Sequence, residues 1–168
     1  MTEEAKLTRL IPEYRAYAMS LVAEKQFAED LVQDALERAL RAPNRPKRSR
    51  DLRPWMFKII RNLHLDELRK YRVRREYAAR EARSLTEGSG QNQDRDVLVR
   101  LAFERLPSDK KEVLLLVDVI GLKYAEAAEV MDVAVGTVMS RLSRARRALA
   151  EEVGEFRDKG PLRGGKTK

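Results

Sequence analysis

The sequence predicts an all-α protein made of two small helical domains. Apolar residues recur at spacings of three and four along most of the chain, which is the period of an amphipathic helix. No segment alternates apolar and polar residues over a useful length, as a half-buried strand would. Residues 84–95 are rich in Gly, Ser and Gln and have the composition of a flexible linker, which divides the chain in two.

The first domain, residues 1–83, is expected to hold three helices. An apolar stripe predicts the first helix over residues 7–22, and a second stripe predicts another over residues 27–40, with Phe27 on its apolar face. Residues 42–51 contain two prolines and four basic side chains, and this composition predicts a loop.

A third, longer helix is expected to follow this loop and to run to about Tyr77. Asp51 is a suitable N-terminal cap, and Pro54 would then lie in the first turn, where its missing N–H is not needed. Trp55 and Leu68 are among the apolar residues that we expect to face the core.

The second domain, residues 96–153, is expected to begin with a helix that ends before Pro107. Ser108 is a suitable cap for the next helix, and Gly121 is placed to end it. Both signals are local, because a serine hydroxyl accepts a hydrogen bond from a free N–H and glycine adopts the left-handed conformation without strain.

A helix-turn-helix motif is predicted in the rest of this domain. A short helix over residues 124–131 is followed by a tight turn at Asp132-Val133 and by a long basic helix over residues 135–153. At about 100° per residue, the long helix would bury one apolar stripe and present serine and arginine on its outer face. Residues 154–168 are rich in Gly and Lys and are expected to form a disordered tail.

The outer face of the long helix has the residue types that read bases in a DNA major groove. Arginine bonds bidentately to guanine, and serine donates or accepts without blocking insertion of the helix. The outward residues are Ser140, Ser143, Arg144 and Arg147. Thr137 lies at the edge of this face in the first turn, where free N–H groups favour phosphate, and Arg141 projects nearer the core and is assigned to backbone contact. The alternative is an ordinary amphipathic helix with a basic exterior.

The net charge of +8 is unevenly distributed along the chain. Residues 38–80 carry 15 basic and 4 acidic side chains, and residues 138–168 carry 9 and 4, which makes two basic blocks. Residues 1–37 carry 4 basic and 8 acidic side chains, and residues 81–137 carry 7 and 11, so both are acidic blocks. We therefore expect two anion-binding surfaces and at least one acidic surface, although solvated helix faces give similar runs of charge.

The composition excludes several kinds of site. With no cysteine and one histidine, His64, the chain cannot form a disulfide scaffold, a thiolate metal site, a cysteine nucleophile or a histidine-rich zinc site. We expect no cofactor, no metal and no enzymatic activity, and we interpret His64 as a surface or packing residue. No apolar run approaches the roughly 20 residues of a membrane helix, and no signal peptide is evident at Met1, so a cytoplasmic protein without membrane insertion is expected.

Four stretches of sequence carry a specific resemblance. The first domain contains AEDLVQDALERAL (28–40) and LRPWMFKIIRNLHLDELRK (52–70), and the second contains RLPSDKKEVLLLVDVIGL (105–122) and GLKYAEAAEVMDVAVGTVMSRLSRARRAL (121–149). Together these stretches resemble domains 2 and 4 of the extracytoplasmic-function (ECF) sigma factors, group IV of the sigma-70 family of bacterial RNA polymerase, over about residues 5–153. The resemblance implies a protein that joins core polymerase, recognises the −35 and −10 promoter elements, and melts DNA to start transcription of a specific regulon.

The resemblance assigns the −35 element to the last helix. By position, the residues carried over are Met139, Ser140, Ser143 and Arg144. Met139 departs from the basic residue that often stands there, and it could instead pack on a thymine methyl group. Asp132 stands where a turn glycine is usual, and Asp tolerates the left-handed conformation better than most residues.

The resemblance assigns the −10 element to the helix over residues 52–76 and to the loop before it. Asn62 is a poor helix former in mid-helix, and its amide suits a base edge, so it is the leading base-reading candidate. Asn44 and Arg45 are candidates for a pocket that captures a flipped-out base, whose extrusion costs a few kcal/mol.

Further residues of the long helix are candidates for DNA contact. Trp55 would lie near the upstream edge of melted DNA, although a purely structural place in the core is the favoured interpretation. Asp66 could contact DNA or pair with Arg69. Phosphate contacts, which position the protein without specifying sequence, are expected from a basic cluster that comprises Arg69, Lys70, Arg72, Arg74 and Arg75.

The resemblance also implies protein partners. The helix over residues 27–40 corresponds to the one that docks on the β′ clamp helices of core polymerase, and its outward residues are Asp30, Gln33, Asp34 and Glu37. An acidic face suits a basic partner, although a plain solvated face would have the same composition. The second domain is expected to meet the β flap, and an anti-sigma factor that clamps both domains is expected to control a stress-response regulon. Association with the nucleoid would follow from binding polymerase.

Two other functions remain open from the sequence alone. A free-standing helix-turn-helix regulator would bind DNA without polymerase, but it would not need the acidic face of the first domain. An adaptor that uses both domains only for protein contacts would show no salt-dependent binding to DNA.

Overall fold

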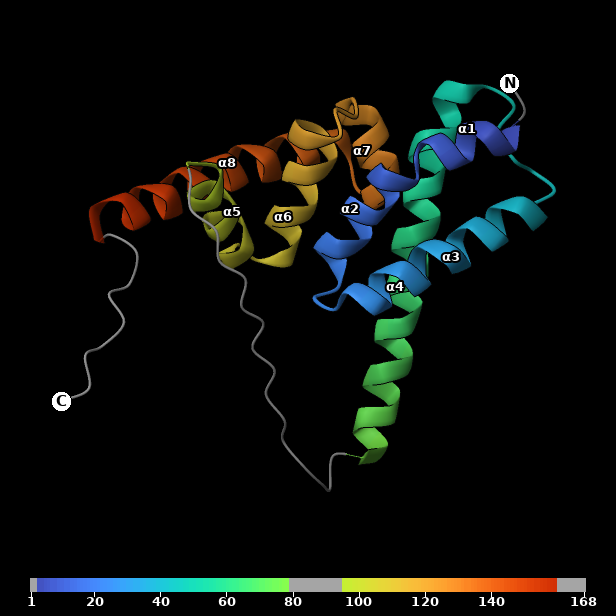
Figure 1. The fold of residues 1–168 in the computed structure, drawn as a ribbon, viewed down its shortest axis with the longest axis horizontal. Coiled ribbons are helices and arrows are strands. Elements are labelled where there is room, and N and C mark those ends of the chain that lie inside the picture. The colour runs from blue at the N-terminus through green and yellow to red at the C-terminus, as the bar shows by residue number, and fades with distance from the viewer. Residues whose placement is uncertain (1–2, 79–94, 160–168) are drawn as a thin grey trace.

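The computed structural model describes residues 3–78 and 95–159, and these ranges contain helices and no strand, as predicted (Figure 1). The first unit contains α1 (Glu3–Arg9), α2 (Ile11–Leu21), α3 (Lys25–Arg41) and α4 (Ser49–Ala78). The second unit contains α5 (Arg95–Arg105), α6 (Ser108–Leu114), the π-helical segment η1 (Leu115–Val119), α7 (Tyr124–Met131) and α8 (Val135–Lys159). The predicted linker, except for Arg95, lies outside the described residues.

The N-terminal stretch forms two helices where the sequence predicted one over residues 7–22. α1 ends at Arg9, and α2 begins after Leu10, whose φ is −93° and ψ is 0°. Pro12 explains the break. In the first turn of α2 it needs no N–H to donate, whereas inside a continuous helix its ring would clash with the carbonyl of Thr8.

α4 begins earlier than predicted, at Ser49. Asp51 is therefore a first-turn residue and not the cap, and its N–H donates to the Arg48 carbonyl at 3.0 Å. Pro54 lies inside the helix. Because the helix begins at Ser49, the loop was predicted too long and the helix start too late. The helix ends at Ala78, one residue beyond the predicted end.

The second unit differs from the prediction at two helix ends. Ser108 is the first residue of α6 and Pro107 occupies the cap position, so the predicted serine cap is wrong. α8 continues to Lys159, so the predicted tail is wrong for its first six residues, 154–159, because Gly154 costs an exposed helix only about 1 kcal/mol. Residues 160–168 lie outside the described ranges.

Two left-handed residues end helices as the sequence predicted. Within the described ranges, Gly121 has φ +79° and Asp132 has φ +54°, and no other residue has positive φ. Gly121 follows the α6–η1 segment, and Asp132 is the C-terminal cap of α7. These turns set the direction of α7 and of the long helix α8 after it.

The apolar face of each helix is mostly, but not always, the predicted one. In the first unit, Tyr14 and Tyr17 both pack edge-on against Phe57, with ring centroids 5.5 and 5.2 Å apart. Phe27 and Leu68 were predicted to face the core, but they are 59% and 45% exposed. Phe27 lies about 100° from the middle of the buried stripe of α3, and Leu68 lies on the part of α4 that projects beyond the other helices (Figure 1).

The two units are packed against each other. α4 contacts α7, and α2 contacts both α6 and η1. Buried residues of both units form one continuous apolar cluster, which includes Phe57 and Ile60 from α4 and Leu116 and Ala127 from the second unit. The helix-turn-helix motif therefore lies beside the first unit (Figure 1).

Candidate nucleic-acid interface

α8 has the buried and exposed faces that the helical projection predicted. Val138, Leu142 and Ala145 are buried, and Leu149 is partly buried against the core. On the opposite face, the exposed side chains are Ser140, Ser143, Arg144 and Arg147. Gly136 is also exposed, and a Cβ there would meet no atom within 4 Å, so another backbone has room to approach.

The exposed face of α8 is ordered by hydrogen bonds within the helix. Ser140 Oγ donates to the Thr137 carbonyl at 3.1 Å. Arg144 Nε donates to the Ser140 carbonyl at 3.2 Å, and another nitrogen of the same guanidinium donates to Ser140 Oγ at 3.3 Å. The serine and arginine at positions i and i+4 are therefore held together on the exposed face.

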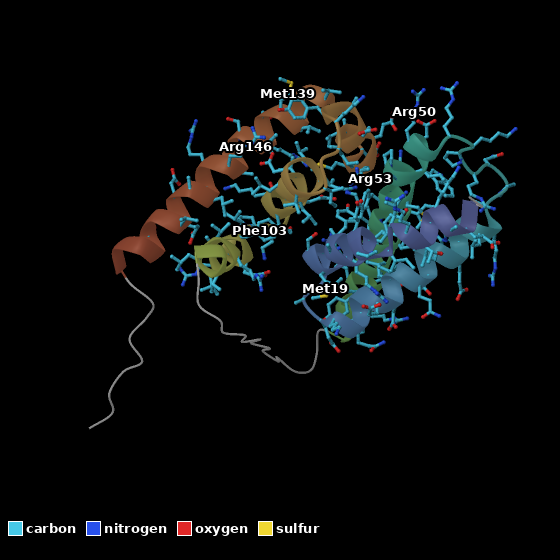
Figure 2. All side chains as sticks on the ribbon, turned by 45° about the horizontal axis from the view of Figure 1, so that its top comes forward. Met19, Arg50, Arg53, Phe103, Met139 and Arg146 are labelled. Atoms are coloured by element: carbon cyan, nitrogen blue, oxygen red, sulfur yellow. The ribbon has the colours of Figure 1, made fainter. Side chains whose placement is uncertain are left out.

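The remaining residues assigned to the −35 element lie around that face. Met139 is 53% exposed and lies at the outer edge of α8 (Figure 2). Thr137 and Arg141 are half-buried, which agrees with their predicted places at the edge of the face and nearer the core. An apolar side chain, a hydroxyl and several guanidinium groups are thus available on one surface.

Arg146 was not among the candidate residues, and in the structure it forms an ion pair with Asp118. Its Nε donates to Asp118 Oδ2 at 2.9 Å, and a second nitrogen donates to Asp118 Oδ1 at 2.5 Å. These hydrogen bonds raise the pKa of the guanidinium, and they tie α8 to η1. The pairing spans 28 residues of sequence, so no local pattern could have revealed it.

The projecting part of α4 carries most of the residues assigned to the −10 element. Asn62 is exposed, and so are Arg72 and Arg74. The side chain of Arg75 is outside the described set, although its backbone lies in α4. Trp55 is half-buried and packs against the core, in line with the favoured interpretation of this residue.

Two cations of this cluster are paired within the helix. Arg69 lies 3.1 Å from Asp66, and Lys70 lies 2.7 Å from Glu67. The hydrogen bond from Lys70 lowers the pKa of Glu67. All four side chains are at least 44% exposed, so these pairs are weak and a phosphate group can compete for the cations. Of the two alternatives for Asp66, the structure has the pairing with Arg69.

The loop before α4 holds the other two −10 candidates. Asn44 is exposed and Arg45 is half-buried. The start of α4, with Arg50 and Arg53, lines a cleft of about 630 Å³ that reaches Gly121 and Lys123 of the second unit.

The face of α3 assigned to polymerase is exposed and mainly acidic. Its four residues, Asp30, Gln33, Asp34 and Glu37, are all exposed, while the opposite face of α3 is buried. Asp30 accepts a hydrogen bond from Gln26 at 2.9 Å, and Glu37 lies 3.6 Å from Arg41. Asp34 and Glu37 also line a shallow hollow between α3 and α4, of about 260 Å³, that has Leu63 in its wall. A protein partner therefore finds both charge and apolar surface there.

A polar cluster that the sequence did not predict lies between the two units. Tyr17 Oη donates to Glu112 Oε1 at 2.6 Å, and Arg61 Nε donates to the same oxygen at 2.9 Å. Burial, followed by the charge of Glu112, raises the pKa of Tyr17 well above its ordinary value. His64 is half-buried nearby, and burial lowers its pKa. The one sequence signal is a glutamate directly before the apolar run over residues 113–117.

The described ranges have neither a metal-binding cluster nor a membrane-spanning helix. Among residues 3–78 and 95–159 there is no group of three His, Asp or Glu side chains placed to hold a metal ion. None of the helices in that part of the chain is both long and apolar enough to cross a membrane.

The first of the two helical units has a basic projecting helix and an acidic face, and the second has a helix-turn-helix motif. This combination defines a sigma-type DNA-binding transcription initiation factor. Family models agree: residues 7–74 match Sigma-70 region 2, and residues 96–149 match Sigma-70 region 4. The chain belongs to the ECF sigma factors of the sigma-70 family. It therefore acts with bacterial RNA polymerase to initiate transcription at promoters.

Individual relatives support this assignment. The chain is 38% identical over 142 residues to "ECF RNA polymerase sigma factor EcfG" of Rhodopseudomonas palustris, which covers 83% of this chain and 78% of that protein. It is 32% identical over 156 residues to "ECF RNA polymerase sigma factor SigL" of Mycobacterium tuberculosis, which covers 88% of both. Among solved structures, the sigma factor RpoE in complex with the anti-sigma factor NepR from Bartonella quintana superposes with a TM-score of 0.68 at 30% identity, over 89% of this chain and 95% of that one.

Proposed function

We propose that three separate surfaces of this sigma factor divide the work of promoter recognition. The acidic face of α3 docks on the β′ clamp helices of core polymerase. The projecting part of α4 and the loop before it open and read the −10 element. The exposed face of α8 reads the −35 element in the major groove. Two observations carry this proposal: α3 and α8 each have an exposed face with most of the assigned side chains opposite a buried face, and the projecting part of α4 has its basic side chains exposed.

The proposal for α8 rests on the pairing of Ser140 with Arg144. Each residue already uses the other as a partner, so the guanidinium is oriented before DNA arrives, and less side-chain freedom is lost when it binds a guanine. Arg146 is committed to Asp118, which leaves Arg144 and Arg147 as the exposed cations of this face.

The proposal for α4 rests on the exposure of Asn62 and on the weakness of the ion pairs around it. Asp66 and Glu67 hold Arg69 and Lys70 only in exposed pairs, so the cations transfer to phosphate at little cost. Asn62 supplies an amide that can bond a base edge. Asn44 and Arg45 lie in the loop before α4, where a flipped-out base would be held.

The proposal extends to three further aspects of function. We assign the β flap as the polymerase site for the second unit. We assign control by an anti-sigma factor, since the similar structure of the sigma factor RpoE is a complex with the anti-sigma factor NepR. A stress-response regulon, a cytoplasmic location and association with the nucleoid through polymerase belong to the same proposal.

Reconstitution with purified core polymerase tests the proposal. The chain should permit specific transcription from a subset of promoters, and substitution of Asp34 and Glu37 by Lys should weaken binding to a β′ clamp fragment. A free-standing regulator would instead bind its DNA equally well without polymerase. Failure to bind core enzyme, or to change its promoter choice, would contradict the proposal.

Arg144→Ala tests the reading of the −35 element. Loss of a bidentate contact should cost about 1–3 kcal/mol at one base position and relax specificity there. Arg100, an exposed arginine on α5, provides the matched control, and Arg100→Ala should leave base preference unchanged. Promoter binding by the holoenzyme is measured on a panel of single-base −35 variants. An equal loss on all sequences would show that Arg144 grips phosphate instead.

A further inference from the structure

The contact between the two units contains a buried ionic cluster that none of the three proposed surfaces uses. Glu112 of α6 is 7% exposed, and its Oε1 accepts hydrogen bonds from Tyr17 of α2 and Arg61 of α4. Tyr17 is fully buried, and the side chain of Arg61 is 17% exposed. Both donors come from the first unit and the acceptor comes from the second, so the cluster exists only while the units are docked.

The energetics of this cluster depend on the docked state. A buried carboxylate is tolerated only when it is paired and hydrogen-bonded, and removal of one partner is strongly destabilising. If the second unit moved away, water would solvate Glu112 on the surface of α6, and Arg61 and Tyr17 on the first unit. Substitution of Glu112 therefore weakens docking far more than it weakens either unit by itself.

A second polar contact joins the units at the other end of the interface. Arg53 of α4 bonds to Glu13 of α2 through Nε at 2.6 Å, and a second nitrogen donates to the Ile120 carbonyl at 2.5 Å. Ile120 is the C-terminal cap of η1, so its carbonyl is one of those that a helix end leaves in need of a donor. A side chain of the first unit thus satisfies a helix end of the second. Arg53 lies where the two units meet (Figure 2).

The docked arrangement conflicts with simultaneous reading of both promoter elements. Elements centred near −35 and −10 lie about 25 base pairs apart, which is about 85 Å along B-DNA at roughly 3.4 Å per base pair. A compact chain of this length has a radius of gyration of about 15 Å, so it is only about 40 Å across. α7 contacts both α4 and α8, which keeps the two DNA-reading helices close together. This step rests on the proposed function.

We propose that the face of the first unit around Tyr17 and Arg61 is a docking surface for this chain's own α6, and that its occupation by Glu112 holds the free sigma factor in a self-inhibited, docked state. The surface fits the buried face of α6, on which one carboxylate, Glu112, lies beside the apolar side chains of Val113 and Leu114. Core polymerase binds the open form, in which α6 has left this surface. Docking then reduces the apparent affinity for polymerase by the fraction of molecules that are open.

A distance measurement tests the docking itself. The chain has no cysteine, so spin labels attach only where Cys is introduced, for example at the exposed positions Ala16 on α2 and Ala150 on α8. Double electron–electron resonance should give one short distance distribution for the parent chain. Glu112→Ala should raise the ratio of open to docked molecules at least tenfold, with unchanged helicity by circular dichroism. Glu129→Ala, at an exposed glutamate of α7, should behave like the parent.

A second pair of variants isolates the hydrogen bond. Tyr17→Phe removes the hydroxyl that bonds Glu112, and it should shift the distribution in the same direction as Glu112→Ala. Tyr14 also packs on Phe57, but its hydroxyl makes no hydrogen bond across the interface. Tyr14→Phe should therefore leave the distances unchanged. Equal distributions for the parent chain, Glu112→Ala and Tyr17→Phe would overturn the assigned latch.

Binding to core polymerase tests the inhibition. Glu112→Ala should bind core enzyme more tightly than the parent, by the factor by which its open fraction rises, and Tyr14→Phe should not. An opened Glu112→Ala variant with unchanged affinity would overturn self-inhibition and leave the proposed function intact. Absence of binding by every form, the parent included, would instead overturn the proposed function, and self-inhibition of polymerase binding would fall with it.

Discussion

At the scale of single residues, the two tyrosines of α2 show that similar packing can hide different energetics. Tyr14 and Tyr17 are both fully buried and both pack edge-on against Phe57. Tyr17 donates a 2.6 Å hydrogen bond to Glu112, whereas the hydroxyl of Tyr14 has no hydrogen-bond partner among the described residues. Burial raises the pKa of Tyr14 as well, so its hydroxyl stays neutral near neutral pH.

Tyr14→Phe should therefore leave stability unchanged or increase it. A buried hydroxyl without a partner costs about 1–3 kcal/mol, and the substitution removes that group while it keeps the ring contact with Phe57. The free energy of unfolding in urea is the measurement, with Tyr17→Phe as the control that should be destabilising. A loss of more than 1 kcal/mol for Tyr14→Phe would show that its hydroxyl has a partner, such as an ordered water.

Residues on one helix were the easiest to predict. The buried stripe and the exposed face of α8 follow from a 100° rotation per residue, and the positions of Ser140, Arg144 and Arg141 confirm the projection. Arg146 was missed because its partner, Asp118, lies on a different element. Helical periodicity predicts the direction of a side chain, but it does not predict which residue of another helix that side chain contacts.

At the scale of elements, substitution of either of two glycines of the second unit by Ala should change the free energy of unfolding, but in opposite directions. Gly121→Ala should lower the free energy of unfolding by about 1–2 kcal/mol, because φ is +79° there and an alanine is strained in that conformation. A Cβ at Gly121 would meet no atom within 4 Å, so strain and not a clash is the cause. Gly154→Ala, inside α8 and equally free of neighbours, should raise it by about 0.5–1 kcal/mol.

Urea unfolding of the two variants distinguishes these causes. Strain and helix propensity act in opposite directions for the same chemical change, so a common effect on both variants is not expected. Destabilisation by Gly154→Ala would mean that α8 is not helical at that position in solution, which would favour the tail that the sequence had predicted. A neutral Gly121→Ala would mean that the turn before α7 relaxes.

The existence and order of the helices could be predicted, but several ends could not. Periodicity identifies a helix over many residues, whereas an end depends on one or two local interactions. At Pro12 the ring geometry outweighed a continuous apolar stripe and split one predicted helix into two. At Ser108 a good capping side chain was present, but the backbone of Pro107 took the cap position. Phe27 shows that an apolar residue near a helix start need not face the core.

At the scale of the whole molecule, the docking of the two units had no signal in the sequence. The composition of residues 84–95 predicts a flexible linker, and such a linker permits both docked and separated units. What distinguishes the two states is the meeting of Glu112 with Tyr17 and Arg61, residues 95 and 51 positions away. Candidate sites that lie on one exposed helix face could be predicted, and the site that joins the units could not.

The same interface predicts a dependence of stability on pH. His64 is half-buried on α4, and burial, the largest effect, lowers its pKa below the ordinary value of 6.5; the charge of Arg61 also lowers it and that of Glu112 raises it. Because the folded chain binds this proton less tightly than the unfolded chain, the free energy of unfolding is highest above the ordinary pKa of histidine and falls as pH drops below it.

The free energy of unfolding should therefore decline from about pH 7.5 to about pH 5.5, and His64→Gln should decline less over the same window. His64 is the only histidine of the chain, so its substitution removes the one histidine titration. Carboxylates that titrate near the acidic end of the window act equally in both proteins, and the difference between the two pH curves isolates His64. Parallel curves would show that protonation of His64 costs no more in the folded chain than in the unfolded chain, and that this side chain is exposed to water in solution.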